Sequence, residues 1–108
     1  MNLSITLDMT IPHALGEWTL AEAVESLKRQ RWTSLLENTP EDISEHELTF
    51  RRAVRHGRTP TIGEVLAAYY VAAMEQLDKE YYEDEAITNG QYRYRKSEIR
   101  RLVFRKAV

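Results

Sequence analysis

The chain contains no cysteine, which excludes disulfide bonds, thiolate nucleophiles and cysteine-based zinc sites. Only four glycines and three prolines occur among its 108 residues. The glycines are too scattered to form a phosphate-binding loop. The longest apolar run, Val65 to Met74, is far shorter than the ~20 residues that a membrane-spanning helix needs. Because the N-terminus also lacks a signal-peptide pattern, we expect a cytoplasmic protein with no membrane segment.

Patterns typical of catalytic and metal sites are missing as well. His13, His46 and His56 do not have the i, i+4 spacing that places two imidazoles on one metal ion. No G-x-S-x-G turn is present, and the acidic run over residues 80–85 lacks the spacing of a calcium-binding loop. We therefore expect neither an enzyme nor a cofactor.

The residues that are present predict one mainly helical domain. Apolar residues make up 43% of the chain and charged residues 30%, which is typical of a globular domain. Thr19 with Glu22, and Ser44 with Glu47, have the spacing of helix-capping boxes. A third capping box begins at Thr61, and an earlier start for the second helix, at Pro40, is also open. We expect helices over residues 19–37, 44–56, 61–87 and 97–107, in a compact bundle of three to four helices.

The N-terminal residues 1–11 have a different pattern. Apolar and polar residues alternate from Leu3 to Ile11, which is typical of a β-strand with one buried face. The strand could pair with residues 92–95, with a second copy of the chain, or with the sheet edge of another protein. It could also lie on the helices as an extended arm. The predicted fold class is thus mainly α with one short strand or arm, the alternative being a small α+β fold with a two-stranded sheet.

Charge is strongly segregated although the net charge is only −2. Residues 75–85 carry six carboxylates against Lys79 alone, whereas residues 91–108 carry seven Lys and Arg against Glu98 alone. Three explanations remain open for the basic segment. It could neutralise the acidic one within the molecule, bind an acidic protein, or bind nucleic acid.

These features favour a binding protein. We expect a non-catalytic interaction module, a small accessory regulator or inhibitor that docks on a larger protein, which could itself process nucleic acid. By analogy of size and composition, such chains are common in bacteria and their viruses. The alternatives are direct nucleic-acid binding through the basic segment, helped by Arg51 to Arg58, and a structural subunit of a homo-oligomer such as a homodimer. The candidate contact residues are Leu3, Ile5, Leu7, Tyr92, Arg93, Tyr94, Arg95, Arg100, Arg101, Phe104 and Arg105.

Overall fold

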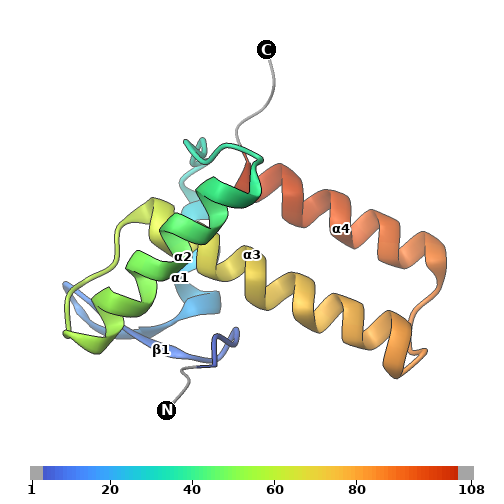
Figure 1. The fold of residues 1–108 in the computed structure, drawn as a ribbon, viewed down its shortest axis with the longest axis horizontal. Coiled ribbons are helices and arrows are strands. Elements are labelled where there is room, and N and C mark those ends of the chain that lie inside the picture. The colour runs from blue at the N-terminus through green and yellow to red at the C-terminus, as the bar shows by residue number, and fades with distance from the viewer. Residues whose placement is uncertain (1–3, 105–108) are drawn as a thin grey trace.

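A computed structural model describes residues 4–104 and confirms a mainly helical fold with a small two-stranded sheet (Figure 1). Within these residues the chain forms two strands, four α-helices and one π-helical turn. In chain order they are β1 (Thr10–His13), β2 (Gly16–Thr19), α1 (Leu20–Arg29), α2 (Pro40–Arg55), α3 (Ile62–Asp78), η1 (Lys79–Glu83) and α4 (Asn89–Val103).

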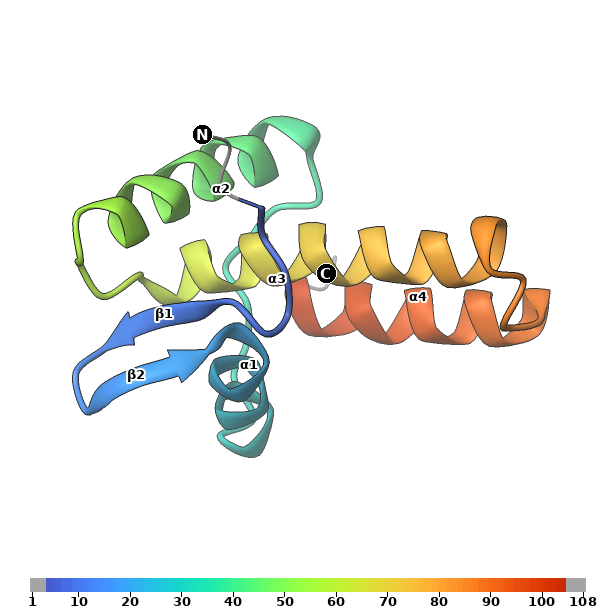
Figure 2. The ribbon, with the colours of Figure 1, turned by 90° about the horizontal axis from the view of Figure 1, so that it is seen from below.

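The central helix is α3, which contacts α1, α2 and α4. Its first half carries small and aliphatic side chains that are buried, including Leu66. Figure 2 shows the consequence for the shape, because α3 and α4 run side by side as a hairpin that extends away from the rest of the molecule. The seven largest completely buried side chains hold the core together: Phe50, Leu20, Leu36, Leu66, Leu77, Val24 and Val103. Within the described residues, no helix is both long and apolar enough to span a bilayer.

The strand predicted within residues 1–11 begins later than expected, because Thr10 and Ile11 are the only described residues of that segment that lie in a strand. The strands form a hairpin further along the chain, in which Ile11 is paired with Trp18. Residues 92–95, considered as a partner strand, belong to α4. The residues before β1 are instead held by α1, because the carbonyls of Leu7 and Met9 accept hydrogen bonds from the first-turn amides of that helix.

Helix starts follow the capping residues. Thr19 and Glu22 form the predicted capping box of α1, and Thr61 caps α3. The second helix begins at Pro40 rather than at Ser44. The Thr39 hydroxyl accepts a hydrogen bond from the backbone amide of Asp42, and proline suits the first helical position. The fourth begins at Asn89 rather than at residue 97, because Thr88 forms a capping box that Gln91 closes.

Two helices end earlier than predicted. The first ends at Arg29 rather than at residue 37, and Leu36 forms a parallel bridge with Phe104 instead. The third ends at Asp78, followed by η1 up to Glu83, so residue 87 lies in the connection to α4. Part of the predicted 97–107 helix lies outside the described residues.

Candidate functional site: a groove between α1, α3 and α4

A groove of about 470 Å³ lies where the C-terminal end of α1 meets α3 and α4. It is lined by cationic side chains and by two aromatic ones, above an apolar floor that includes Ile99 and Leu102. Glu98 is the one carboxylate among the lining residues that the structure describes. We call this cavity the basic groove and define it by Lys28, Arg31, Trp32, Tyr69, Arg95 and Arg101.

Arg31 and Trp32 reach the groove because of the way α1 ends. The amide of Trp32 donates a hydrogen bond to the carbonyl of Leu27, and the amide of Arg31 donates one to the carbonyl of Lys28, both at 3.1 Å. These two bonds form a Schellman motif, whose left-handed position is usually taken by glycine. Here Arg31 holds it with φ of 53°. Unfavourable backbone conformations of this kind cluster at functional sites.

Arg31→Gly is expected to raise the free energy of unfolding by about 0.5–1 kcal/mol, because glycine adopts left-handed φ without the steric penalty of a side chain. Urea unfolding followed by circular dichroism measures the change. The matched control is Arg29→Gly, which removes the same charge from the exposed last residue of α1. It should instead lower stability by about 1 kcal/mol. Equal destabilisation by both variants would contradict the interpretation of Arg31.

The four cations of the basic groove differ in their pairing. Lys28 lies 3.5 Å from Glu25, and Arg95 lies 2.6 Å from Glu80. Among residues 4–104, neither Arg31 nor Arg101 has a carboxylate partner in a salt bridge, and Arg101 bonds only to the Ser97 hydroxyl, at 3.4 Å. Two guanidinium groups therefore remain available for an anionic ligand.

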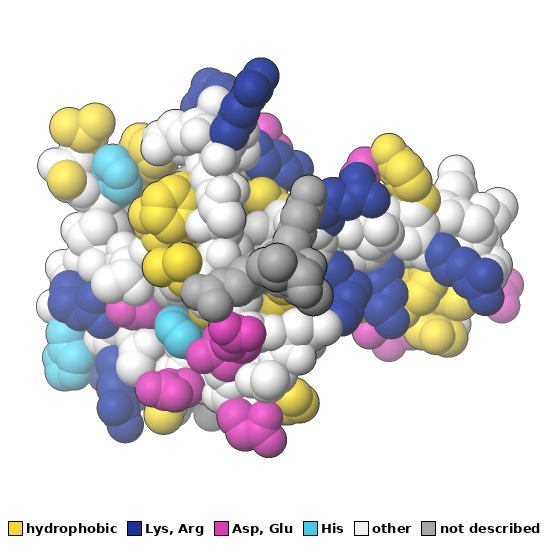
Figure 3. All heavy atoms as spheres, turned by 90° about the horizontal axis from the view of Figure 1, so that it is seen from above, with side chains coloured by type: hydrophobic (Ala, Val, Ile, Leu, Met, Phe, Trp, Pro, Cys, Tyr) yellow, Lys and Arg dark blue, Asp and Glu magenta, His cyan; other side chains and the backbone are white. Residues whose placement is uncertain are grey.

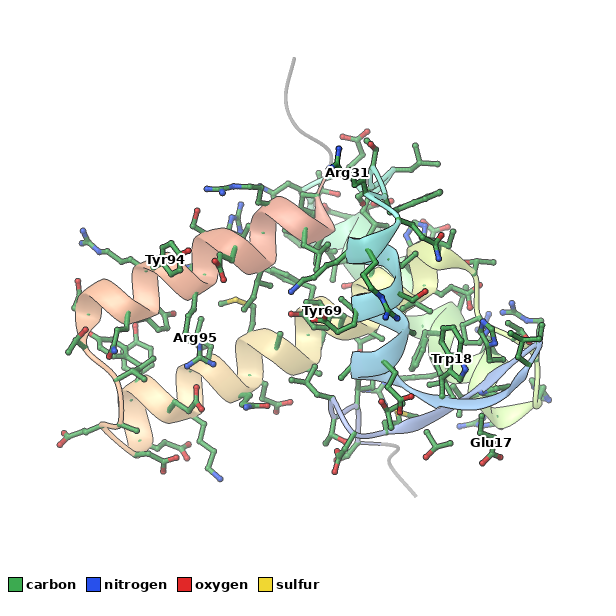
Figure 4. The ribbon with its side chains drawn as sticks, turned by 180° about the vertical axis from the view of Figure 1, so that it is seen from behind. Glu17, Trp18, Arg31, Tyr69, Tyr94 and Arg95 are labelled. Atoms are coloured by element: carbon green, nitrogen blue, oxygen red, sulfur yellow. The ribbon has the colours of Figure 1, made fainter. Side chains whose placement is uncertain are left out.

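Tyr69 lies in the middle of the groove, on the α3 side (Figure 4). Partial burial raises the pKa of its hydroxyl, and the charges of Lys28 and Arg95 act in the opposite direction to Glu25 and Glu98. The hydroxyl is therefore a neutral hydrogen-bond donor over the physiological pH range. Trp32 also lines the groove, and its exposed part supplies apolar surface. The groove thus combines an apolar floor, a neutral donor and two cations that have no carboxylate partner within residues 4–104.

A second cleft of about 590 Å³ adjoins the basic groove and has the opposite charge. Its lining includes Glu75, Asp78 and Glu83 against Lys79 alone, together with the exposed ring of Tyr82. Leu7 and Gln76 line both cavities and so form the boundary between them. We call this second cavity the acidic cleft.

The structure distributes the predicted contact residues over several surroundings. Leu7, Arg95 and Arg101 line the basic groove. Ile5 and Phe104 are buried in the core, and Arg100 lies over the Phe104 ring. Figure 3 shows Lys and Arg side chains gathered over α4, where Arg93 and Tyr94 are exposed, and Figure 4 shows Tyr94 pointing away from α3. Tyr92 packs at the end of the helix hairpin, and Leu3 and Arg105 lie outside the described residues.

Lys28, Arg31, Trp32 and Tyr69 were not among the contact residues predicted from the sequence. The first three fell inside a helix that was predicted to continue to residue 37, so they did not stand out. A glycine at position 31 would have marked the helix end, and its absence removed that signal. Only the packing of α1 against α3 brings these residues to the basic segment.

The described residues contain no cluster of three or more His, Asp or Glu that could hold a metal ion. Part of the charge segregation is neutralised internally, since Arg95 forms an ion pair with Glu80. The Asp78 carboxylate also accepts a hydrogen bond from the Tyr92 hydroxyl at 2.7 Å. Comparison of the chain with protein-family models, with curated proteins and with solved structures found no match.

Proposed function

We propose that this protein is a non-catalytic interaction module that docks an acidic segment of a larger protein in the basic groove. The observation that carries the proposal is the joint presence, in one groove, of two guanidinium groups without a described acidic partner and an apolar, aromatic floor. Such a groove suits a peptide that carries carboxylates beside an apolar side chain, because charge and apolar area are satisfied together. A role as a cytoplasmic regulator or inhibitor fits this mode of action.

Nucleic acid is less well matched to the same groove. A phosphate backbone is bound through many cations at once, whereas among the four cations that line this groove only Arg31 and Arg101 lack a described carboxylate partner. The acidic cleft adjoins the groove and would repel the continuing backbone. A single-stranded oligonucleotide should accordingly bind the chain only with a Kd of about 10⁻⁴ M or weaker at physiological salt.

The decisive experiment is affinity capture from nuclease-treated host extract with the full chain as bait. Arg31→Glu/Arg101→Glu is expected to reduce capture of the protein partner at least ~10-fold, since it reverses both unpaired cations of the groove. Arg52→Glu/Arg55→Glu is the control, because it makes the same charge change on exposed positions of α2. This control should capture as much partner as the wild type.

Two results would refute the proposal. One is equal capture by the groove variant and the α2 variant, which would show that the groove is not the docking surface. The other is loss of capture by every bait after nuclease treatment, which would show that nucleic acid mediates the contact. Purified partner and chain should then give the same ranking in a direct titration, which removes any effect of the extract.

A further inference from the structure

The acidic end of the α3–α4 hairpin is the second surface with unusual backbone geometry. The turn η1 is π-helical, a form that is rare and is frequently found at functional sites. Glu85 follows it with φ of 49°, in the left-handed region. The side chains of Glu83, Asp84 and Glu85 are exposed there, and Tyr82 is 68% exposed among them. We call residues 82–85 the acidic tip.

The acidic tip has the chemistry that the basic groove is suited to bind. It offers three carboxylates to Arg31 and Arg101, which have no carboxylate partner among the described residues, and the exposed part of the Tyr82 ring to the apolar floor. The two left-handed non-glycine residues that the structure describes, Arg31 and Glu85, lie one at each surface. Local strain is therefore placed at both members of a charge-complementary pair.

A chain cannot place its own tip in its own groove. Asn89 and Arg101 are separated by about 18 Å along α4 at 1.5 Å per residue. The hairpin is also fixed by the Arg95–Glu80 ion pair and by the hydrogen bond from Tyr92 to Asp78, so the tip cannot fold back. Among the described residues, a groove that the tip can enter is therefore found only on another molecule.

From these observations we infer that the basic groove binds the acidic tip of a second copy of this chain. The contact is heterologous, because two different surfaces meet. It rests on the proposed function in one respect, namely that the acidic tip of a second copy and the partner protein bind in the same groove. The fraction of free grooves then falls as the concentration of the chain rises, and an acidic partner segment competes with the tip.

The test is analytical ultracentrifugation of the full-length wild type, of two charge variants and of a mixture of these variants. Wild type should self-associate with a Kd of roughly 100 μM at low salt and more weakly as salt rises. Glu83→Lys/Asp84→Lys makes tip and groove both basic, and Arg31→Glu/Arg101→Glu makes both acidic. Each variant alone should associate at least ~10-fold more weakly than the wild type. An equimolar mixture of the two should associate, because every tip then meets a groove of opposite charge.

A monomeric wild type at about 1 mM and low salt would overturn the inference. So would a mixture that associates no more than its separate components. Circular dichroism of each variant confirms that it is folded. Because the chain has no cysteine, a mixture of Tyr82→Cys and Arg101→Cys chains gives a second measurement. It should form a disulfide faster than a mixture of Leu48→Cys and Arg101→Cys, and equal rates would contradict the contact.

The outcomes also separate this inference from the proposed function. The Glu83→Lys/Asp84→Lys variant retains an intact groove, so it should capture the protein partner as well as the wild type while failing to self-associate. Partner capture without any self-association refutes only the second-copy contact. Self-association without groove-dependent capture refutes only the docking of a separate protein.

Discussion

Phe50→Ala is expected to lower the free energy of unfolding by about 3–5 kcal/mol. Phe50 lies on α2 and is completely buried, and it is the largest such side chain among the residues described. Truncation removes its burial and leaves a cavity between α2 and α3 that the rigid helices can only partly close. Urea unfolding at constant temperature measures the loss, which is a large share of the stability of a domain of this size.

Leu48→Ala provides the comparison on the same helix. Leu48 is two residues away but 50% exposed, so its truncation removes much less buried area. The expected loss is below about 1 kcal/mol. A Phe50→Ala variant that unfolds at the same urea concentration as Leu48→Ala would show that α2 does not pack on the core as described.

Tyr92→Ala is expected to cost about 2–3 kcal/mol and to loosen the end of the α3–α4 hairpin. The Tyr92 ring stacks on Tyr81 with centroids 4.5 Å apart and contacts Tyr82 edge-on at 5.8 Å. Its hydroxyl donates a hydrogen bond to Asp78. Tyr92→Phe retains the ring contacts and should cost only about 1 kcal/mol. Equal losses for the two variants, measured by thermal unfolding, would argue against the ring cluster.

The same hydrogen bond makes the contribution of Tyr92 dependent on pH. Donation to Asp78, followed by burial, raises the pKa of Tyr92 above its ordinary value of 10.0. The folded state therefore keeps this proton at a pH where the unfolded state has lost it. The stabilisation is complete below pH 10 and declines as pH rises toward the folded-state pKa. The difference in unfolding free energy between the wild type and Tyr92→Phe should accordingly shrink as the pH rises above 10.

Local signals in the sequence were sufficient to place the starts of α1 and α3. Thr19 and Thr61 cap their helices as predicted because the bonds of a cap are made within one turn. At α2 the choice between Thr39 and Ser44 depended on competing caps, and the proline at the first position decided it. The capping box at Thr88 escaped notice because the alternating residues after Gly90 suggested a strand.

The candidate site was less accessible to sequence reasoning. Arg95 and Arg101 were predicted as contacts because the basic segment is evident in the sequence. Their partners in the groove come from α3 and from the C-terminal end of α1. No local pattern links residues that are between 26 (95 − 69) and 73 (101 − 28) positions apart. The hydrogen bonds of residues 7 and 9 to α1 were unpredictable for the same reason, since they satisfy amides of another element. Tertiary packing, rather than any motif, assembles this surface.

The boundary formed by Leu7 and Gln76 has a consequence for how the molecule meets a partner. It separates a cavity lined mainly by cations from one lined mainly by carboxylates, and this separation of opposite charges makes the region an electric dipole. In the field of a charged partner a dipole experiences a torque that turns the groove toward the target before contact. Added salt would therefore slow association more than it speeds dissociation.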